Sequence, residues 1–118
     1  MKALHVFAGA GGSVQTGRML GWASAGAVEI NEFCCRVLEH HGEKVLANDV
    51  KTFSGRGVPA QIVCGGFPCQ DVSVAGGRAG AGSESRSGLW RHMLRVWSET
   101  GAPYLFAENV RGLLSSNG

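Results

Sequence analysis

Cys69 is the residue of this 118-residue chain best placed to act as a nucleophile. It follows an apolar strand that ends at two glycines, and it begins a polar, glycine-rich stretch. Ligands bind at the carboxyl ends of strands in sheets built from alternating strands and helices. A thiolate at such an edge is accessible, and backbone donors or a nearby cation can stabilise it. The other cysteines fall within a predicted helix or strand, where cysteine usually acts as a small buried hydrophobe: Cys34, Cys35 and Cys64.

A carboxylate is predicted at the same edge of the sheet. Glu108 directly follows the apolar run 104–107, which reads as the next strand. A glutamate beside a thiolate can protonate or hydrogen-bond a polar heterocycle. Taken singly, Cys69 is equally an ordinary loop thiol and Glu108 a surface carboxylate.

A second group of residues suits a nucleotide-like cofactor. Gly9, Gly11 and Gly12 form a turn after the first predicted strand, where glycines let the backbone approach a ligand closely. Glu29 lies about twenty residues further on, where an acidic side chain can accept hydrogen bonds from ribose hydroxyls. The alternative is that the glycines only shape a tight turn and that Glu29 is solvated.

The turn favours S-adenosylmethionine over a dinucleotide as the cofactor. Val14 stands where the dinucleotide fingerprint has its third glycine, so a cofactor without a pyrophosphate fits better. Its adenine needs an apolar or aromatic face, which Phe7 or Ile30 can provide.

The elements that must position these residues are predicted from the apolar pattern. Short apolar runs predict five strands, at 3–7, 27–30, 44–47, 60–64 and 104–107. Three helices lie between them, with apolar positions at Val14, Met19, Leu20 and Trp22, then at Phe33, Cys34, Val37 and Leu38, and finally at Trp90, Met93, Leu94 and Trp97. Asn31 is placed to cap the second helix. The alternation predicts an α/β fold with a doubly wound, mostly parallel sheet in one domain.

Composition excludes several classes of protein. No apolar run reaches the length of a membrane span and the first residues do not resemble a signal peptide, so we expect a cytoplasmic protein. The four cysteines match neither a zinc ribbon nor a disulfide-stapled domain, so no metal is expected. A net charge of +2 neither indicates nor excludes DNA as a partner.

In order along the chain, these motifs resemble the first half of the DNA cytosine-5 methyltransferase family. The matching segments are Phe7–Gly12, Glu29, Asp49, Gly66–Gln70 and Glu108–Val110. The resemblance covers almost the whole chain, and Phe-Pro-Cys-Gln followed by Glu-Asn-Val is its most specific part. It implies a Rossmann-like fold that uses S-adenosylmethionine, as in the enzymes of restriction-modification systems.

The resemblance also implies roles for individual residues. It places Phe7, the glycine turn, Pro68 and Leu89 beside the cofactor, Glu29 on the ribose and Asp49 near the adenine amino group. Cys69 would add to C6 of cytosine while Glu108 contacts N3 and the exocyclic amine. The ring then becomes electron-rich enough at C5 to attack the sulfonium methyl.

The DNA contacts are expected in the stretch that follows the nucleophile. Because the target atom is hidden in stacked duplex DNA, the cytosine must be flipped out of the helix. The resemblance makes this stretch the element that closes over the flipped base, with contacts from Gln70, Ser73, Arg78 and Arg86. The two arginines are equally consistent with a solvated loop.

The chain also departs from the family pattern. His5 stands where many members have an acidic or small polar residue. The arginine-containing segment, the target-recognition region and the carboxyl-terminal helix have no counterpart, so we expect a truncated domain. It would be a fragment, or one half of a split enzyme whose second chain supplies the missing parts. The alternatives are an inactive remnant or partner-binding module, and a nucleotide-dependent redox protein.

Overall fold

The computed structural model describes residues 1–68 and 88–109, which form one parallel sheet flanked by helices. The strands are β1 (Lys2–Val6), β2 (Ala23–Val28), β3 (Val45–Ala47), β4 (Ile62–Gly66) and β5 (Tyr104–Glu108). Their spatial order is β3-β2-β1-β4-β5, and every neighbouring pair is parallel. The carboxyl ends of all five strands therefore meet at one edge. The order reverses between β1 and β4, which is where ligands bind in sheets of this kind.

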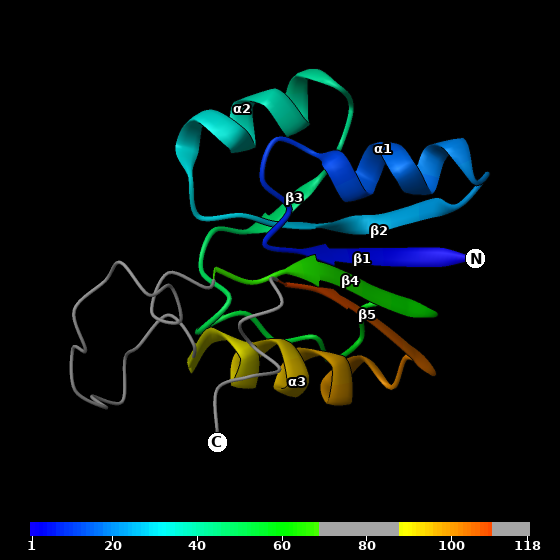
Figure 1. Ribbon diagram of the computed structural model, residues 1–118, viewed down its shortest axis with the longest axis vertical. Helices are drawn as coiled ribbons and strands as arrows, with labels where there is room; N and C mark the ends of the chain where they lie inside the picture. The colour runs from blue at the N-terminus through cyan, green and yellow to red at the C-terminus, as the bar shows by residue number, and fades with distance from the viewer. Residues whose placement is uncertain (69–87, 110–118) are drawn as a thin grey trace.

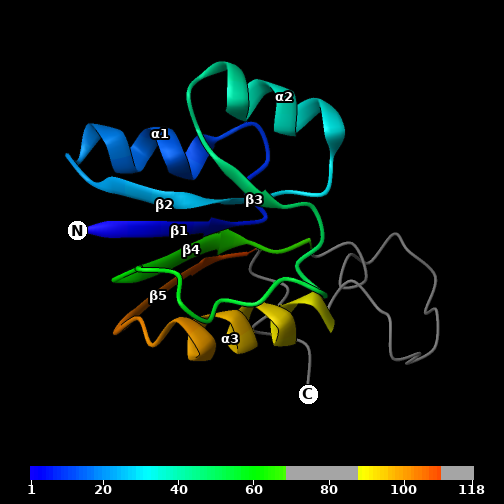
Figure 2. The same ribbon diagram turned by 180° about the vertical axis from the view of Figure 1, so that it is seen from behind.

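Helices cover both faces of the sheet, as the sequence predicts. Helices α1 (Gly12–Met19) and α2 (Glu32–His40) lie on one face, and α3 (Leu89–Thr100) lies on the other (Figure 1). Seen from behind, the connection from β3 to β4, residues 48–61, runs alongside α3 (Figure 2). This arrangement is the doubly wound fold.

The core is divided between the two faces. The larger cluster lies between the sheet and α3 and contains Leu4, Val6, Val28, Val50, Val63, Phe67, Met93, Val96 and Ala102. A second cluster lies on the side of α1 and α2 and contains Ala8, Val14, Ala27 and Leu38, and a third contains Ala3, Ile62 and Cys64. Burial on both faces explains the continuous apolar runs of β1 and β4, whereas Tyr104 and Phe106 of β5 are 58% and 61% exposed.

Helix α2 has the predicted cap, but the prediction of which of its residues are buried is partly wrong. Asn31 Oδ1 accepts a hydrogen bond from the Cys34 N–H at 3.0 Å, as expected of a cap. Phe33, however, is 65% exposed, and Cys35 is buried where Cys34 was expected to be. The Cys35 thiol donates a hydrogen bond to the carbonyl of Glu29, a contact that the apolar pattern of the helix does not show.

Other boundaries also differ from the sequence pattern. The first helix ends at Met19, and both Met19 and Leu20 are largely exposed, at 80% and 60%. The second strand begins at Ala23 and ends before Glu29, and the fourth strand includes both of its glycines. These differences concern the ends of elements, where pairing with neighbouring strands decides the length.

A small polar network is buried beneath α1. His5 is 2% exposed in the middle of β1, and its Nδ1 is 3.0 Å from Ser13 Oγ. Burial lowers the pKa of His5, with the Glu43 charge opposing this effect and the Arg18 charge adding to it. Glu43 is itself buried and pairs with Arg18 and with Ser24. The residue that departs from the family pattern is thus a neutral, hydrogen-bonded core side chain at neutral pH.

Candidate functional site

A cavity of about 350 Å³ opens at the carboxyl edge of the sheet. It is lined by residues that follow four different strands and by the first residue of α3: Phe7, Val28, Glu29, Ile30, Asn48, Asp49, Val50, Lys51, Gly66, Pro68 and Leu89. Its size is in the range of small-molecule and cofactor sites. Six of the nine residues predicted to contact a cofactor line it, namely Phe7, Glu29, Ile30, Asp49, Pro68 and Leu89.

The Glu29 side chain joins two turns of the backbone, the one that follows β1 and the one that follows β2. Its side chain is 8% exposed, and its Oε2 accepts a hydrogen bond from the Gly9 N–H at 2.6 Å. Its Oε1 accepts one from the Asn31 N–H at 3.0 Å. Because each carboxylate oxygen has two lone pairs, acceptor capacity remains for a ligand hydroxyl. The solvated-surface alternative for Glu29 is therefore wrong.

The glycine turn shapes the cavity without lining it. Gly9 and Gly11 have positive φ angles of 56° and 105°, a conformation that favours glycine. Gly11 and Gly12 border a separate hollow between α1 and α2. Phe7 also has a positive φ, 52°, which is uncommon for a residue with a side chain and is found at functional sites. Phe7 therefore lines the cavity, whereas Gly9, Gly11 and Gly12 do not.

The opposite wall is a turn that begins at Asp49. The Lys51 N–H donates to Asp49 Oδ1 at 2.9 Å, and the Phe53 N–H donates to the Asp49 carbonyl at 3.1 Å. Val50, buried between them, provides an apolar surface on the cavity. The cavity therefore has two carboxylates on its rim and apolar side chains on its walls.

Glu108 lies beside the end of β4, as predicted. It is the last residue of β5 and pairs with Gly66, where an added Cβ would lie 2.9 Å from Glu108 Oε2. The next residue, Asn109, donates from Nδ2 to the carbonyl of Phe67 at 3.1 Å. Glu108 and Asn109 therefore fix the backbone at Gly66 and Phe67, next to Pro68.

Two of the three described thiols are not suited to nucleophilic chemistry. Cys35 and Cys64 are buried, and burial raises the pKa of both. All three described cysteines, Cys34 among them, are free thiols. Within residues 1–68 and 88–109 no cluster of His, Cys, Asp or Glu could hold a metal ion. The same residues contain no helix long and apolar enough to cross a membrane.

Five predicted site residues lie outside the described residues: Cys69, Gln70, Ser73, Arg78 and Arg86. Five cavity residues were missed from the sequence: Val28, Asn48, Val50, Lys51 and Gly66. All five are at or just after the carboxyl end of a strand. Because ligands bind at these ends, the five residues could have been predicted if the exact end of each strand had been known.

Comparison with known proteins gives one family. The model of the C-5 cytosine-specific DNA methylase family matches residues 1–118. The Type II methyltransferase M.NgoMIV of Neisseria gonorrhoeae is 32% identical over 95% of this chain and 36% of its own length. M.Eco47II of Escherichia coli is 34% identical over 95% of this chain and 28% of its own length. The chain thus spans about a third of the length of these curated relatives.

Solved structures agree on the fold. The Dnmt2 methyltransferase of S. pombe matches with a TM-score of 0.72 and 19% identity, over 99% of this chain and 36% of its own. A prophage-encoded protein of E. coli, assigned as a DNA modification methyltransferase, matches with a TM-score of 0.75 and 24% identity, over 97% of this chain and 33% of its own. The predicted Rossmann-like methyltransferase fold is confirmed. The chain belongs to the C-5 cytosine-specific DNA methylase family.

Proposed function

We propose that this chain forms the cofactor site and carries the nucleophile of a DNA cytosine-5 methyltransferase. The observation that supports this most is the cavity, which gathers six separately predicted residues next to the strand end that bears Glu108. Family membership does not favour the redox alternative.

The cavity residues fit S-adenosylmethionine. Glu29 can accept hydrogen bonds from the ribose hydroxyls, and Asp49 can accept one from the adenine amino group. Phe7, Ile30 and Val50 offer apolar surfaces for the adenine ring. When bound, the cofactor supplies an electrophilic methyl group on a sulfonium.

The protein groups would then activate the cytosine. The Cys69 thiolate forms a bond to C6, while Glu108 holds a proton at N3, so that the electron pair of the ring becomes available at C5. C5 takes the methyl group as the methyl–sulfonium bond breaks, which would leave a neutral thioether, and C5 afterwards loses its proton to a base. The bond from Cys69 to C6 breaks, and the electron pair returns to sulfur. Duplex DNA with a flipped cytosine is the proposed substrate, and the cytoplasm is the proposed location of the reaction. The part of the relatives that this chain does not span would read the target, in the same or a second chain.

A covalent trap tests this proposal. The complete gene product is incubated with S-adenosylmethionine and mixed-sequence duplex DNA in which 5-fluorocytosine replaces cytosine. Fluorine at C5 cannot leave as a proton does, so a protein–DNA adduct should survive a denaturing gel. Cys69→Ser should abolish the adduct, and Cys34→Ser should retain it as the matched control. An unaltered protein that forms no adduct, or a Cys69→Ser variant that still forms one, would overturn the mechanism.

A further inference from the structure

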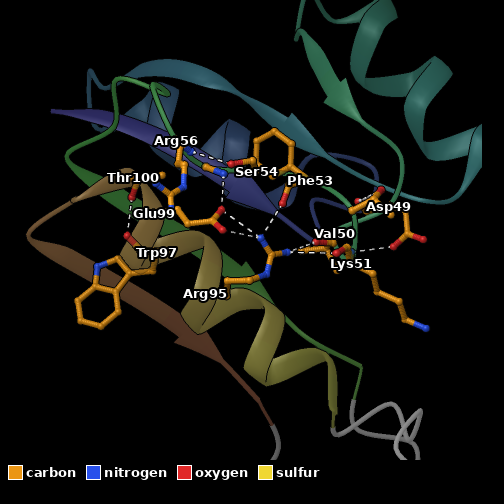
Figure 3. Close-up of polar contacts among 12 residues, drawn as sticks. Asp49, Val50, Lys51, Phe53, Ser54, Arg56, Arg95, Trp97, Glu99 and Thr100 are labelled. Carbon is orange, nitrogen blue, oxygen red and sulfur yellow. Dashed lines mark hydrogen bonds and ion pairs between the residues drawn. The ribbon is translucent and has the colours of Figure 1, made fainter.

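The turn Asp49–Phe53, whose first three residues line the cavity, is held by a side chain from another element. The N–H groups of Thr52 and Phe53 bond to the Asp49 carbonyl, at 3.3 and 3.1 Å, inside the turn itself. The carbonyls of the turn point the other way, toward α3 (Figure 3). Backbone carbonyls next to a packed helix need donors, because an unpaired buried carbonyl is costly.

Arg95, in the middle of α3, provides these donors. Its Nη2 donates to the carbonyl of Val50 at 2.7 Å, and its Nη1 donates to that of Phe53 at 2.8 Å. A longer contact of 3.4 Å joins Nη2 to the Lys51 carbonyl. One planar guanidinium thus binds carbonyls from both ends of the turn, which a lysine ammonium cannot do from one position.

Glu99 fixes the guanidinium and extends the contact. Both of its carboxylate oxygens lie 3.0 Å from Arg95 Nη1, one helical turn away. The Gly55 N–H donates to Glu99 Oε2 at 2.8 Å, and this bond is the main reason that the pKa of Glu99 is lowered. A Cβ at Gly55 would lie 2.6 Å from the carbonyl oxygen of Val96, so the loop backbone rests directly on the helix.

The same helix provides the facing wall of the cavity. Leu89, its first residue, lines the cavity together with Asp49, Val50 and Lys51. Arg95 is six residues further along, or about 9 Å at the rise of an α-helix. A displacement of the turn relative to α3 would therefore change the separation of two cavity walls.

We propose that Arg95 is a positioning residue for the cofactor, which fixes the Asp49–Lys51 wall of the cavity against Leu89. This inference rests on the proposed function, since it assumes that S-adenosylmethionine binds in the cavity. Arg95 is 34% exposed and does not line the cavity, so its effect on the cofactor is transmitted through the backbone of the turn.

Hydrogen exchange of the complete gene product without cofactor is the first measurement. Arg95→Met keeps most of the side-chain volume and removes the donors. Amides of residues 51–55 should exchange about tenfold faster or more, the factor expected for losing one hydrogen bond from a charged group. Amides of β1 and β4 should keep their rates. Arg91→Met, an exposed arginine on the same helix, is the matched control and should leave all of these rates unchanged.

Cofactor binding to the same variants is the second measurement. We expect the Kd for S-adenosylmethionine to rise about tenfold in Arg95→Met and to change little in Arg91→Met. Arg95→Lys, which can reach one carbonyl but not both, should fall between them and provides a milder variant if Arg95→Met folds poorly. In methyl transfer, the KM for the cofactor should rise while kcat at saturation stays near that of the unaltered protein.

The outcomes separate this inference from the proposed function. Unaltered protein that does not bind S-adenosylmethionine would reject the proposed function and this inference with it. Unaltered protein that binds, beside an Arg95→Met variant with the same Kd, would reject only the positioning role. Faster exchange spread over the whole sheet would also reject it, since Arg95 would then be a general stabilising residue.

Discussion

Glu29→Gln should destabilise the fold even without a ligand, because Glu29 joins two turns of the backbone. Its two oxygens accept hydrogen bonds from the Gly9 and Asn31 N–H groups, at 2.6 and 3.0 Å. A glutamine keeps one oxygen acceptor and presents an amide donor to the other N–H group. The variant therefore loses at least one hydrogen bond to a charged acceptor, which is worth about 1.5–3 kcal/mol. Because both bonds are only partly buried, we expect the lower end of this range, about 1.5 kcal/mol.

Urea unfolding followed by tryptophan fluorescence measures this difference. The control is Glu39→Gln, which changes an exposed glutamate on α2 in the same way and should alter the free energy of unfolding by less than about 0.5 kcal/mol. The slope with urea should be the same for both variants, since neither changes the core. Equal stabilities of the two variants would refute the view that Glu29 organises the cofactor turn.

Two further predictions concern the core beneath the site. Burial lowers the pKa of His5, so below its ordinary value of 6.5 the unfolded chain takes up a proton that the folded chain does not. Stability should therefore fall as the pH drops from 7.5 to 5.5, and His5→Gln should flatten this dependence. The prediction would be contradicted if the free energies of unfolding of the unaltered protein and of His5→Gln, measured with urea, changed with pH in parallel. Gly65→Ala should cost about 3 kcal/mol by urea unfolding, because its Cβ would overlap the backbone carbonyl oxygen of Val6 and would lie 2.8 Å from Val6 Cγ2 and 3.2 Å from Met93 Cε. Gly12→Ala, whose Cβ meets nothing within 4 Å, is its control, and an equally small effect of both would refute the packing argument.

Patterns that depend on near neighbours in the chain could be predicted from the sequence. The five apolar runs and the cap at Asn31 gave the order and the number of the elements in the described residues. The motifs around Phe7, Glu29 and Glu108 predicted a ligand site at one edge of the sheet, where the structure has a cavity, and a carboxylate beside it. Such features are local, because strand pleating, helix periodicity and capping involve residues only a few positions apart.

Contacts between distant segments were decided by the tertiary structure. Periodicity placed Cys34 on the buried face of its helix, but the helix is rotated so that Cys35 reaches the Glu29 carbonyl. The position of the glycine turn after the first strand predicted that Gly11 and Gly12 contact the cofactor, and in the structure both residues border a different hollow.

The sequence by itself predicted the family, which the family comparison confirms, and the strand ends at which the cavity opens. It gave no sign of Arg95, which looks like one more polar residue on an amphipathic helix. The carbonyls that it binds lie 42 to 45 residues away, and only the packing of α3 against the β3–β4 connection brings them within hydrogen-bonding distance. The sequence specifies the type of every side chain. The backbone carbonyls that need a donor from another element are known only once the helices and strands are packed together.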